Sequence, residues 1–353
     1  MDFNSDSRII SRADLLMPET IPYKITGRSK QMDRLRECMR PMGKGAAPFS
    51  AWLYGPAGSG KTAVARKVAG EFCQSAHRVF LYVNCWERPT LYSVVQALCE
   101  QLKVLGADAQ DTNVKLSKLS RVLRNTMTLI ILDEFDRPMP KERDSIVYRL
   151  LQLPRAGLFC ISNTDSAFLS LEERNQSRLS PVRVHFSRYS TAEIEAIITD
   201  RARDTLTPGA FSTNILQAIA PLAQGDARVA LRLLFQAALA AENDHAGRIG
   251  SEHIPSDRST WARSEQARRI ESLPEHQRLV YELVKEHKHI SSTSLRSFYE
   301  TACGKLSIEP VAQRTFSKYV ALLARNNFLA VEQKGAGGSG RLLRLTHHRL
   351  SGR

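Results

Sequence analysis

Short apolar runs alternate with amphipathic stretches through the first half of the chain. Between the runs, apolar side chains recur every three or four positions, as in residues 91–102, and this spacing predicts helices. Continuous apolar runs between helices are typical of strands that are buried on both faces of a parallel sheet. The expected strands are residues 51–54, 79–83, 129–132, 158–162 and 182–186. The alternation therefore predicts an α/β domain with a parallel sheet, whose ligand site lies beyond the carboxyl ends of the strands.

The pattern changes after residue 188. Residues 189–243 keep only the helical spacing, and Ser190 with Glu193 forms a capping box that begins the first of these helices. From residue 270, three helical stretches precede two short strand-like runs around a glycine-rich tip, which is typical of a winged helix-turn-helix. The expected parts are an N-terminal arm with little core of its own at residues 1–22, an α/β core at 23–188, a helical lid at 189–265 and a winged-helix domain at 270–353.

A glycine-rich turn joins the first expected strand to a helical stretch at residues 63–72. It matches the phosphate-binding pattern G-x-x-x-x-G-K-T, in which the glycines let backbone N–H groups face an anion. Lys61 would reach the β- and γ-phosphates, and the Thr62 hydroxyl would hold Mg²⁺. We therefore predict a site for ATP or ADP with Mg²⁺. The expected nucleotide-binding turn is Gly55, Pro56, Ala57, Gly58, Ser59, Gly60, Lys61 and Thr62.

Polar residues follow two of the expected strands. Asp133 and Glu134 end the run at 129–132. Asp133 would hold the Mg²⁺ water shell, and Glu134 would orient or deprotonate the attacking water. Asn163 follows the run at 158–162, where it could sense the γ-phosphate or position the water. Taken alone, an asparagine at a strand end is usually a turn residue.

Three arginines outside the expected strands are candidates for contacts with the phosphates. Arg228 lies in the first turn of a helix, where a cation opposes the helix dipole and benefits from a nearby anion. That anion is either the γ-phosphate or Asp226. Arg174 and Arg178 precede the fifth strand, and either could be an arginine finger that reaches a neighbouring subunit's nucleotide. Their alternative interpretation is as surface arginines in a loop.

The net charge of +14 favours a polyanionic partner, with nucleic acid ahead of an anionic membrane surface. The last 44 residues hold eight Lys and Arg against one acidic residue, a net +7. Arg314, Lys318 and Arg325 share one face of a helical stretch, as a recognition helix in the DNA major groove requires. Lys334 and Arg341 flank the glycine-rich tip, where a wing could meet phosphates or a minor groove. The alternative is a solvated basic helix in a protein-binding winged domain.

No apolar run approaches the ~20 residues of a membrane-spanning helix, and the polar, acidic N-terminus does not match a signal peptide. The six cysteines are scattered without a C-x-x-C pair, as in reduced intracellular proteins. We therefore expect a cytoplasmic, nucleoid-associated protein with no membrane partner and no structural zinc.

Together these features resemble the archaeal-type origin-recognition and cell-division-cycle replication initiators, a family of AAA+ ATPases. The resemblance covers most of the chain, from about residue 18 to about residue 350. The Walker A and B matches are common to all AAA+ proteins, while Asn163 resembles the sensor 1 position and Arg228 lies in a segment similar to sensor 2. Residues 25–28 are similar to the family's entry motif beside the adenine, which implies that Arg28 binds nucleotide. The stretches that are more specific to the initiators are residues 82–85, 88–92, 273–277 and 337–341.

The resemblance implies an αβα parallel-sheet ATPase core, an all-helical lid and a C-terminal winged-helix domain. It implies an ATP-dependent initiator that binds duplex DNA at replication origins through the ATPase insertion and the winged domain. The implied partners are other initiator subunits and the replicative minichromosome-maintenance helicase, which the initiator helps to load. Nucleotide would act as a switch more than as fuel, so hydrolysis by a lone subunit is expected to be slow.

The arginine-finger segment departs from the family, because Asn175 stands where the family usually has an apolar residue. Arg174 is the favoured finger, but Ser177 with Arg178 is similar to the clamp-loader finger motif, so the choice stays open.

Other functions stay open on the sequence alone. A signalling ATPase would pack its winged domain inside the protein, which a basic winged unit disfavours. A clamp-loader-like or transposition-accessory AAA+ ATPase acting on DNA would keep the sensors but would not predict the winged domain. A binding module that never hydrolyses ATP is disfavoured by the intact Glu134. The chain could also be a divergent paralogue that regulates initiation.

Overall fold

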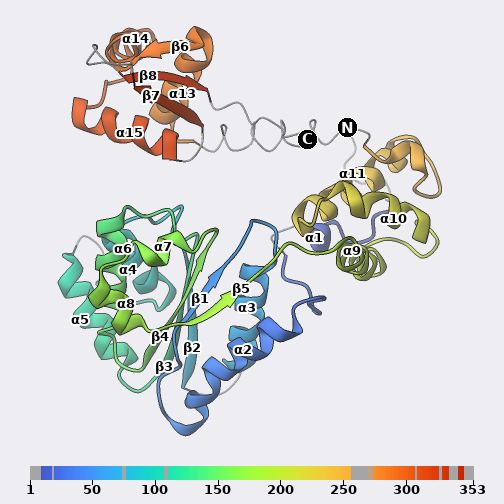
Figure 1. Ribbon diagram of the computed structural model, residues 1–353, viewed down its shortest axis with the longest axis horizontal. Helices are drawn as coiled ribbons and strands as arrows, with labels where there is room; N and C mark the ends of the chain where they lie inside the picture. Colours follow the sequence, from blue (N-terminus) through green and yellow to red (C-terminus); the bar gives the residue numbers. More distant parts are fainter. Residues whose placement is uncertain are drawn as a thin grey trace. The chain divides into compact units, whose positions relative to one another are not determined.

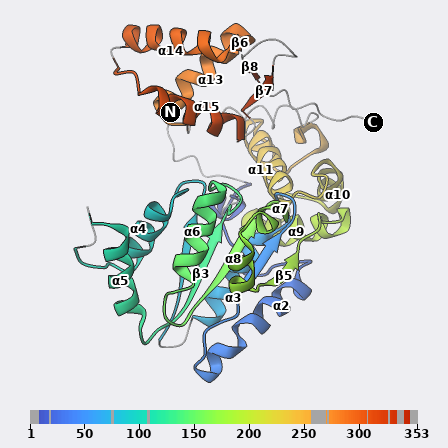
Figure 2. The same cartoon turned by 60° about the vertical axis from the view of Figure 1, so that its left-hand side comes forward.

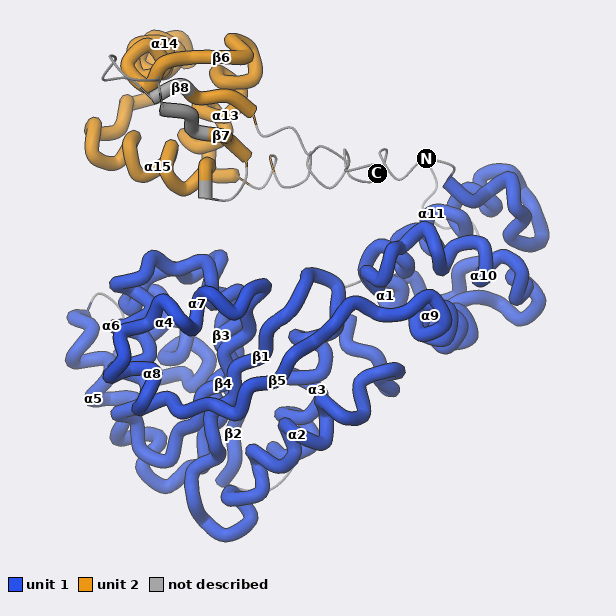
Figure 3. Tube along the Cα trace, viewed as in Figure 1, with its two compact units in different colours: residues 1–256 blue, residues 257–353 orange. Residues whose placement is uncertain are grey.

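The structure is a computed structural model of the 353-residue chain. It describes residues 9–17, 20–73, 77–106, 110–255, 270, 273–306, 308–325, 328–333 and 341–345, with the backbone alone at residues 325, 331–333, 341 and 342. Residues 1–256 and 257–353 form two compact units, which are described separately here (Figure 3). Within the described residues, no helix has the length and apolar character needed to cross a membrane.

The first unit is built on a five-stranded sheet in the order β2-β3-β4-β1-β5. All neighbouring strands are parallel. The strands are β1 (Ala51–Tyr54), β2 (Arg78–Asn84), β3 (Met127–Asp133), β4 (Ala156–Ser162) and β5 (Val182–His185). Each coincides with a run expected from the sequence, so the predicted parallel sheet is confirmed. The register pairs Asn84 with Asp133 and Tyr54 with Ser162, so these strands end at one edge of the sheet.

Helices cover both faces of this sheet because alternate strand residues point to opposite sides. Trp52 packs into one hydrophobic cluster, while its neighbours Ala51 and Leu53 pack into the other. One face carries α2 (Ser29–Met39), the short η1 (Arg40–Lys44) and α3 (Lys61–Phe72). The opposite face carries α4 (Leu91–Gln101), α5 (Thr112–Leu123), α6 (Pro140–Leu150), α7 (Ser166–Leu169) and α8 (Glu173–Leu179). The result is the predicted αβα sandwich (Figures 1 and 2).

The lid follows the sheet and is wholly helical in its described residues. It consists of α9 (Thr191–Thr205), α10 (Thr213–Leu222), α11 (Ala227–Asn243) and the short η2 (Ser251–His253). The expected capping box begins α9: the Ser190 hydroxyl accepts from the Glu193 N–H at 3.2 Å, and the Glu193 carboxylate accepts from the Ser190 N–H at 2.8 Å. This reciprocal pair satisfies two N–H groups that a helix start leaves without partners.

The N-terminal segment packs on the lid. Ile9 and Leu16 are fully buried, and α1 (Ala13–Leu16) contacts α9 and α11. The N–H groups of Ile9 and Ile10 both donate to one Glu242 carboxylate oxygen, at 3.1 and 2.9 Å. The segment was expected to have little core of its own, and the structure shows that it shares the core of the lid instead. The chain therefore enters the ATPase core by way of the lid.

The second unit contains the three expected helices and the expected strand pair. Its elements are α13 (Glu275–His287), β6 (His289–Ser291), α14 (Ser292–Leu306), α15 (Gln313–Arg325), β7 (Leu329–Gln333) and β8 (Arg341–Leu345). The strands form an antiparallel sheet in the order β6-β8-β7. The sequence did not predict β6, because three residues are too few for a period to show. The predicted winged-helix fold is confirmed.

Candidate nucleotide site and nucleic-acid interface

A cavity of about 380 Å³ opens beside the glycine-rich turn in the first unit. One end, called the loop end here, is lined by Lys61, Thr62, Asp133, Glu134, Asn163 and Arg228. The other, the lid end, is lined by Tyr23, Ile25, Ile197, Asp200, Arg201 and Leu231. The structure therefore brings the predicted phosphate, metal and sensor residues to one end of one cavity.

The glycines of the turn are required by close approach as well as by backbone shape. Gly55 has φ of 144°, and a Cβ there would overlap the Phe186 carbonyl oxygen. Gly58 has φ of 72°, and a Cβ there would overlap a carboxylate oxygen of Asp226 in the lid. Ala227 also donates its N–H to the Gly58 carbonyl at 3.2 Å. The turn is thus packed directly against the start of α11.

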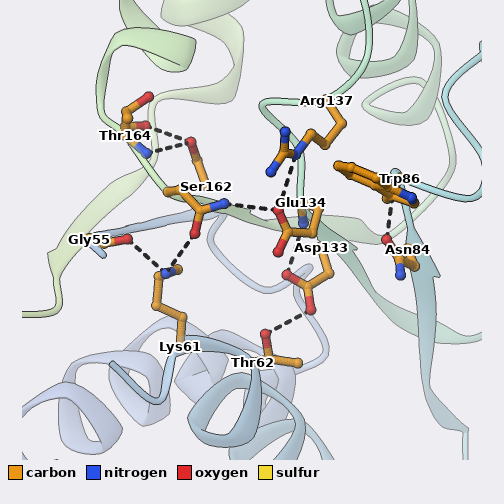
Figure 4. A network of polar contacts seen from close by, with 11 residues as sticks. Gly55, Lys61, Thr62, Asn84, Trp86, Asp133, Glu134, Arg137, Ser162 and Thr164 are labelled. Carbon is orange, nitrogen blue, oxygen red and sulfur yellow. Dashed lines mark hydrogen bonds and ion pairs between the residues drawn. The ribbon is translucent and has the colours of Figure 1, made fainter. Parts of the chain in front are cut away.

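Lys61 is buried at the start of α3 and points back into the turn. Its Nζ donates to the carbonyl of Gly55 at 2.7 Å (Figure 4). It also donates to the carbonyl of Pro56 at 2.9 Å and to Asn163 Oδ1 at 3.3 Å. Burial lowers the pKa of Lys61 from its ordinary 10.5 to about 8. A phosphate group in the turn would supply the negative charge that these neutral carbonyls do not.

Thr62 and Asp133 form a pair suited to a hard divalent cation. The Thr62 hydroxyl donates to Asp133 Oδ2 at 2.7 Å, and the Tyr82 hydroxyl donates to the same oxygen at 2.9 Å. A hydroxyl and a carboxylate at this spacing are oxygen ligands of the kind that Mg²⁺ takes, with waters and phosphate oxygens completing its shell. The residues present therefore fit the predicted metal.

Glu134 and Asn163 are joined across the ends of β3 and β4. Asn163 Nδ2 donates to Glu134 Oε2 at 2.9 Å, while its Oδ1 accepts from Lys61. Glu134 has φ of 51°, a left-handed conformation that is uncommon outside glycine. The residue proposed to act on water is thus held in a constrained geometry and is linked through Asn163 to the phosphate-binding lysine.

Arg228 lines the cavity from the first turn of α11 and is half exposed. Its guanidinium lies 3.5 Å from Asp226 Oδ2, so the carboxylate named as one of its two candidate partners is in contact. Asp226 in turn caps α11 by accepting from the N–H groups of Arg228 at 2.9 Å and Val229 at 3.3 Å. The contact with Asp226 and the position on the cavity wall are compatible, so Arg228 also stays a candidate for the γ-phosphate.

Arg28 is the residue that the family resemblance implies binds nucleotide. It is buried behind the turn and is not among the residues that line the cavity. Its guanidinium donates to the carbonyls of Ser59 at 2.9 Å and Ser187 at 2.6 Å, and it stacks on Tyr189 at 3.7 Å from the ring centre. These contacts hold the turn against the segment after β5, and contact of Arg28 with nucleotide stays a prediction.

Arg174 and Arg178 lie together on α8, away from the cavity. Both guanidinium groups stack on the Tyr148 ring, at 5.0 and 5.1 Å from its centre. Neither lines the cavity of its own chain. The unusual Asn175 between them is buried and donates to the Asp144 carboxylate at 2.7 Å, which ties α8 to α6. Both arginines are thus presented from one anchored helix, and the choice of finger stays a prediction.

In the second unit, Arg314 and Lys318 are exposed on α15, opposite the buried Phe316 and Leu323. This is the two-faced helix that the sequence predicts. Arg325 ends α15 and Arg341 begins β8, but the structure describes only their backbone, and Lys334 lies outside the described residues. A basic helix face is therefore established at two of the five predicted DNA-contact positions.

The turn before α15 is held by side chains of α13 and α14. The Tyr299 hydroxyl accepts from the Val311 N–H at 3.2 Å and lies 2.7 Å from His276 Nδ1. Arg296 donates to the Val311 carbonyl at 2.8 Å. Because both backbone groups of Val311 are bound in this way, the start of the basic helix has a defined position within its unit.

Three family models match the chain: an "AAA domain" over residues 50–163, a "Cdc6 AAA+ ATPase-type lid domain" over 195–258 and a "CDC6, C terminal winged helix domain" over 268–350. The ORC1-type DNA replication protein 1 of Halobacterium salinarum is 33% identical over 304 residues, which cover 83% of this chain and 96% of that protein. The chain belongs to the ORC1-type DNA replication protein family. It is therefore an AAA+ ATPase of DNA replication initiation, and the family expected from the sequence is confirmed.

Other ORC1-type relatives agree over similar lengths. The Sulfurisphaera tokodaii ORC1-type DNA replication protein 1 is 28% identical over 338 residues, which cover 90% of this chain and 84% of that protein. A solved structure of the Aeropyrum pernix ORC1 protein in complex with DNA matches with a TM-score of 0.79 and 28% identity, over 97% of this chain and 95% of that one. The Aeropyrum pernix ORC2 protein in its ADPNP and ADP complexes matches at 0.67 with 20% identity, over 96% and 95%, which shows a shared fold.

Several residues of this ORC1-type site carried no sequence signal of their own. Tyr82 binds Asp133, and Arg137 lies 3.5 Å from Glu134. Asp200 and Arg201 line the lid end from α9, a helix that was predicted only from its capping box and its apolar spacing. Asp226 was named from the sequence as a possible partner of Arg228, and its capping role had a signal too, because an Asp directly before a helical pattern predicts an N-cap. The contacts of Tyr82, Asp200 and Arg201 join segments that are distant in sequence, whereas Arg137 lies three residues from Glu134 in a tight turn.

Proposed function

We propose that this ORC1-type protein binds duplex DNA at replication origins through its second unit, under the control of the nucleotide bound in its first. The observation that carries the proposal is the exposed basic face of α15, in a chain of which 97% matches a DNA-bound ORC1 structure. A helix that presents Arg and Lys on one face and packs Phe and Leu on the other is suited to a DNA groove. Lys334, Arg325 and Arg341 are proposed to extend this contact.

The loop end of the cavity is the proposed site for the phosphates of ATP and for Mg²⁺. Lys61 and the N–H groups of residues 55–62 would bind the phosphates, and Thr62 and Asp133 would hold the metal and its waters. Mg²⁺ bound there would neutralise charge on the phosphates. Glu134 would orient or deprotonate the attacking water, and Asn163 and Arg228 would report on the γ-phosphate.

We propose slow hydrolysis by a lone subunit, because neither Arg174 nor Arg178 lines the cavity of its own chain. An arginine finger from a second initiator subunit would supply the missing positive charge, which is worth about 10³–10⁵ in rate where measured. The ATP-bound assembly would then help to load the replicative minichromosome-maintenance helicase.

The proposed domain limits stay 23–188 for the ATPase core, 189–265 for the lid and 270–353 for the winged domain.

The DNA contact is tested by charge removal on α15 with a matched control on α13. Replacing Arg314 and Lys318 with Ala should weaken duplex binding in a fluorescence anisotropy titration and lower the salt slope by about 0.9 for each lost phosphate contact. The control replaces the exposed Arg278 and Lys285, so that the same net charge is lost elsewhere in the same unit. Equal binding by the two double variants would reject α15 as the contact.

Origin binding is tested by mapping the full-length protein on genomic DNA in its cells. Enrichment at one or a few replication start sites is expected. Diffuse or transposon-linked binding would instead point to an accessory AAA+ ATPase.

A further inference from the structure

The carboxylate of Glu134 has a cationic neighbour that is not part of the nucleotide-binding motif. Arg137 Nε lies 3.5 Å from Glu134 Oε2, the same oxygen that accepts from Asn163 at 2.9 Å. A tight turn makes this possible, because the Arg137 N–H donates to the Glu134 carbonyl at 2.9 Å. Figure 4 shows Glu134 between Asp133 on one side and Arg137 on the other. The general-base candidate is therefore engaged by two donors at one oxygen.

Arg137 is itself held by an aromatic ring from the turn after β2. Its guanidinium lies over Trp86, 4.5 Å from the ring centre, a distance at which a cation is attracted to an aromatic face. Trp86 is placed by Asn84, whose side-chain oxygen accepts from the Trp86 N–H at 3.0 Å at the end of β2 (Figure 4). Because Asn84 and Asp133 are partners in the sheet register, this ring and Glu134 lie at the same edge.

The ion pair between Arg137 and Glu134 is partly buried. Side-chain exposures of 25% for Arg137 and 34% for Glu134 mean that water competes only in part for their contact. The planar guanidinium can bind the carboxylate through its edge while its face rests on Trp86. A carboxylate that activates water must direct an oxygen and its lone pair toward that water. Each donor already bound to Glu134 reduces the time that it spends in that geometry.

We propose that Arg137, held over Trp86, is a positioning residue that restrains Glu134 and so slows ATP hydrolysis. This rests on the proposed role of Glu134 as the residue that acts on water. Arg137 does not line the cavity, so it acts on the rate of the chemical step and leaves ATP binding unchanged. Trp86 acts on the same step through Arg137.

The test compares ATP hydrolysis by the full-length protein and its Arg137→Met variant, which keeps the length of the side chain and removes its charge. We expect kcat to rise about two- to fivefold, the range that release of a partly exposed ion pair allows, while KM for ATP stays unchanged. Trp86→Leu should raise kcat by less, and adding it to Arg137→Met should give no further rise. Lys141→Met, which removes an exposed charge from α6, is the matched control and should leave kcat unchanged.

Glu134→Gln separates the two claims. If Glu134→Gln hydrolyses ATP at the wild-type rate, the role proposed for Glu134 is wrong and the restraint falls with it. If Glu134→Gln is inactive but neither Arg137→Met nor Trp86→Leu raises kcat, the restraint alone is wrong. A fall in kcat for a folded Arg137→Met, checked by its thermal melting curve, also overturns the proposal. Trp86→Leu keeps the test decisive if Arg137→Met does not fold.

Discussion

The two ends of the cavity are built in different ways. The loop end is made by one continuous turn and by the ends of two adjacent strands, and its side chains bind one another at hydrogen-bond distance. The lid end is made by residues 20–26 and by helices α9 and α11. There, Arg201 donates to the carbonyls of Leu15 and, at 3.3 Å, Thr20, and Asp200 accepts from Thr26 at 2.9 Å.

This difference predicts that substitutions at the two ends have different effects on binding. Apart from Arg228, which comes from α11, the loop end is positioned by the sheet, so it depends less on the lid than the other end does. The lid end depends on contacts between the N-terminal segment and the lid, so a displacement of the lid would change it first. We therefore expect substitutions at the loop end to weaken the binding of any polyphosphate. Substitutions at the lid end should weaken only the binding of a complete nucleotide.

Removing the Lys61 ammonium should have the largest effect. Lys61→Ala should weaken binding of a fluorescent ATP analogue by roughly 100-fold, because a charged donor at the phosphates contributes about 3 kcal/mol. Lys30→Ala, an exposed lysine on α2, is the control and should bind normally. Affinity within threefold of wild type for Lys61→Ala would contradict the assignment of the loop end.

Gly58→Ala tests the contact between the turn and the lid. The new methyl would overlap Asp226, and the left-handed φ of 72° adds strain of about 1–2 kcal/mol, so we expect about 30-fold weaker ATP binding by calorimetry. Gly70→Ala is the matched control, because nothing lies within 4 Å of its Cβ position in α3. It should raise the melting temperature slightly, since Ala favours helix by about 1 kcal/mol. Equal binding by both variants would show that the turn tolerates displacement of the lid.

The low pKa of Lys61 predicts a pH dependence confined to the loop end. Below about pH 8 the lysine is charged with or without nucleotide, so it makes no contribution to the pH dependence of ATP affinity. Above about pH 8, Lys61 of the free protein loses its proton, while the negative charge of a bound phosphate keeps Lys61 protonated. Binding of ATP at this pH therefore takes up a proton. ATP affinity should fall with rising pH, by at most about tenfold per pH unit. Titrations from pH 7 to pH 9.5 should show this decline in the wild type, and its persistence in Lys61→Ala would assign it to another group.

Arg201→Ala should have the smallest effect on binding and the most informative one. Losing the donor to Leu15 and Thr20 loosens the N-terminal segment, so we expect about threefold weaker ATP binding and a lower melting temperature. Competition by inorganic tripolyphosphate should be unchanged, because the loop end is intact. Arg121→Ala, exposed on α5, serves as the control. If tripolyphosphate binding also weakened, the two ends would not be independent.

Most of the loop end could be predicted from the sequence, because its determinants are short and continuous. A turn that binds phosphate needs its glycines, lysine and threonine within eight positions, and a parallel sheet brings its strand ends together. Asp133, Glu134 and Asn163 followed from those two facts. The contacts of Arg28 did not follow, because its buried guanidinium binds the backbone of Ser59 and Ser187, which are distant from it in sequence.

The sequence by itself determined the parallel sheet, the phosphate-binding turn, the helical lid and the basic face of α15, because each is encoded by local periodicity or a continuous motif. Only the tertiary structure decided that residues 9–16 belong to the lid core, that Asp226 lies against Gly58 and that Arg137 lies over the Trp86 ring. These contacts join segments or side chains whose approach depends on how the whole chain packs. No local pattern records such an approach, because the free energy that selects it comes from burial and hydrogen bonding between elements that are formed separately.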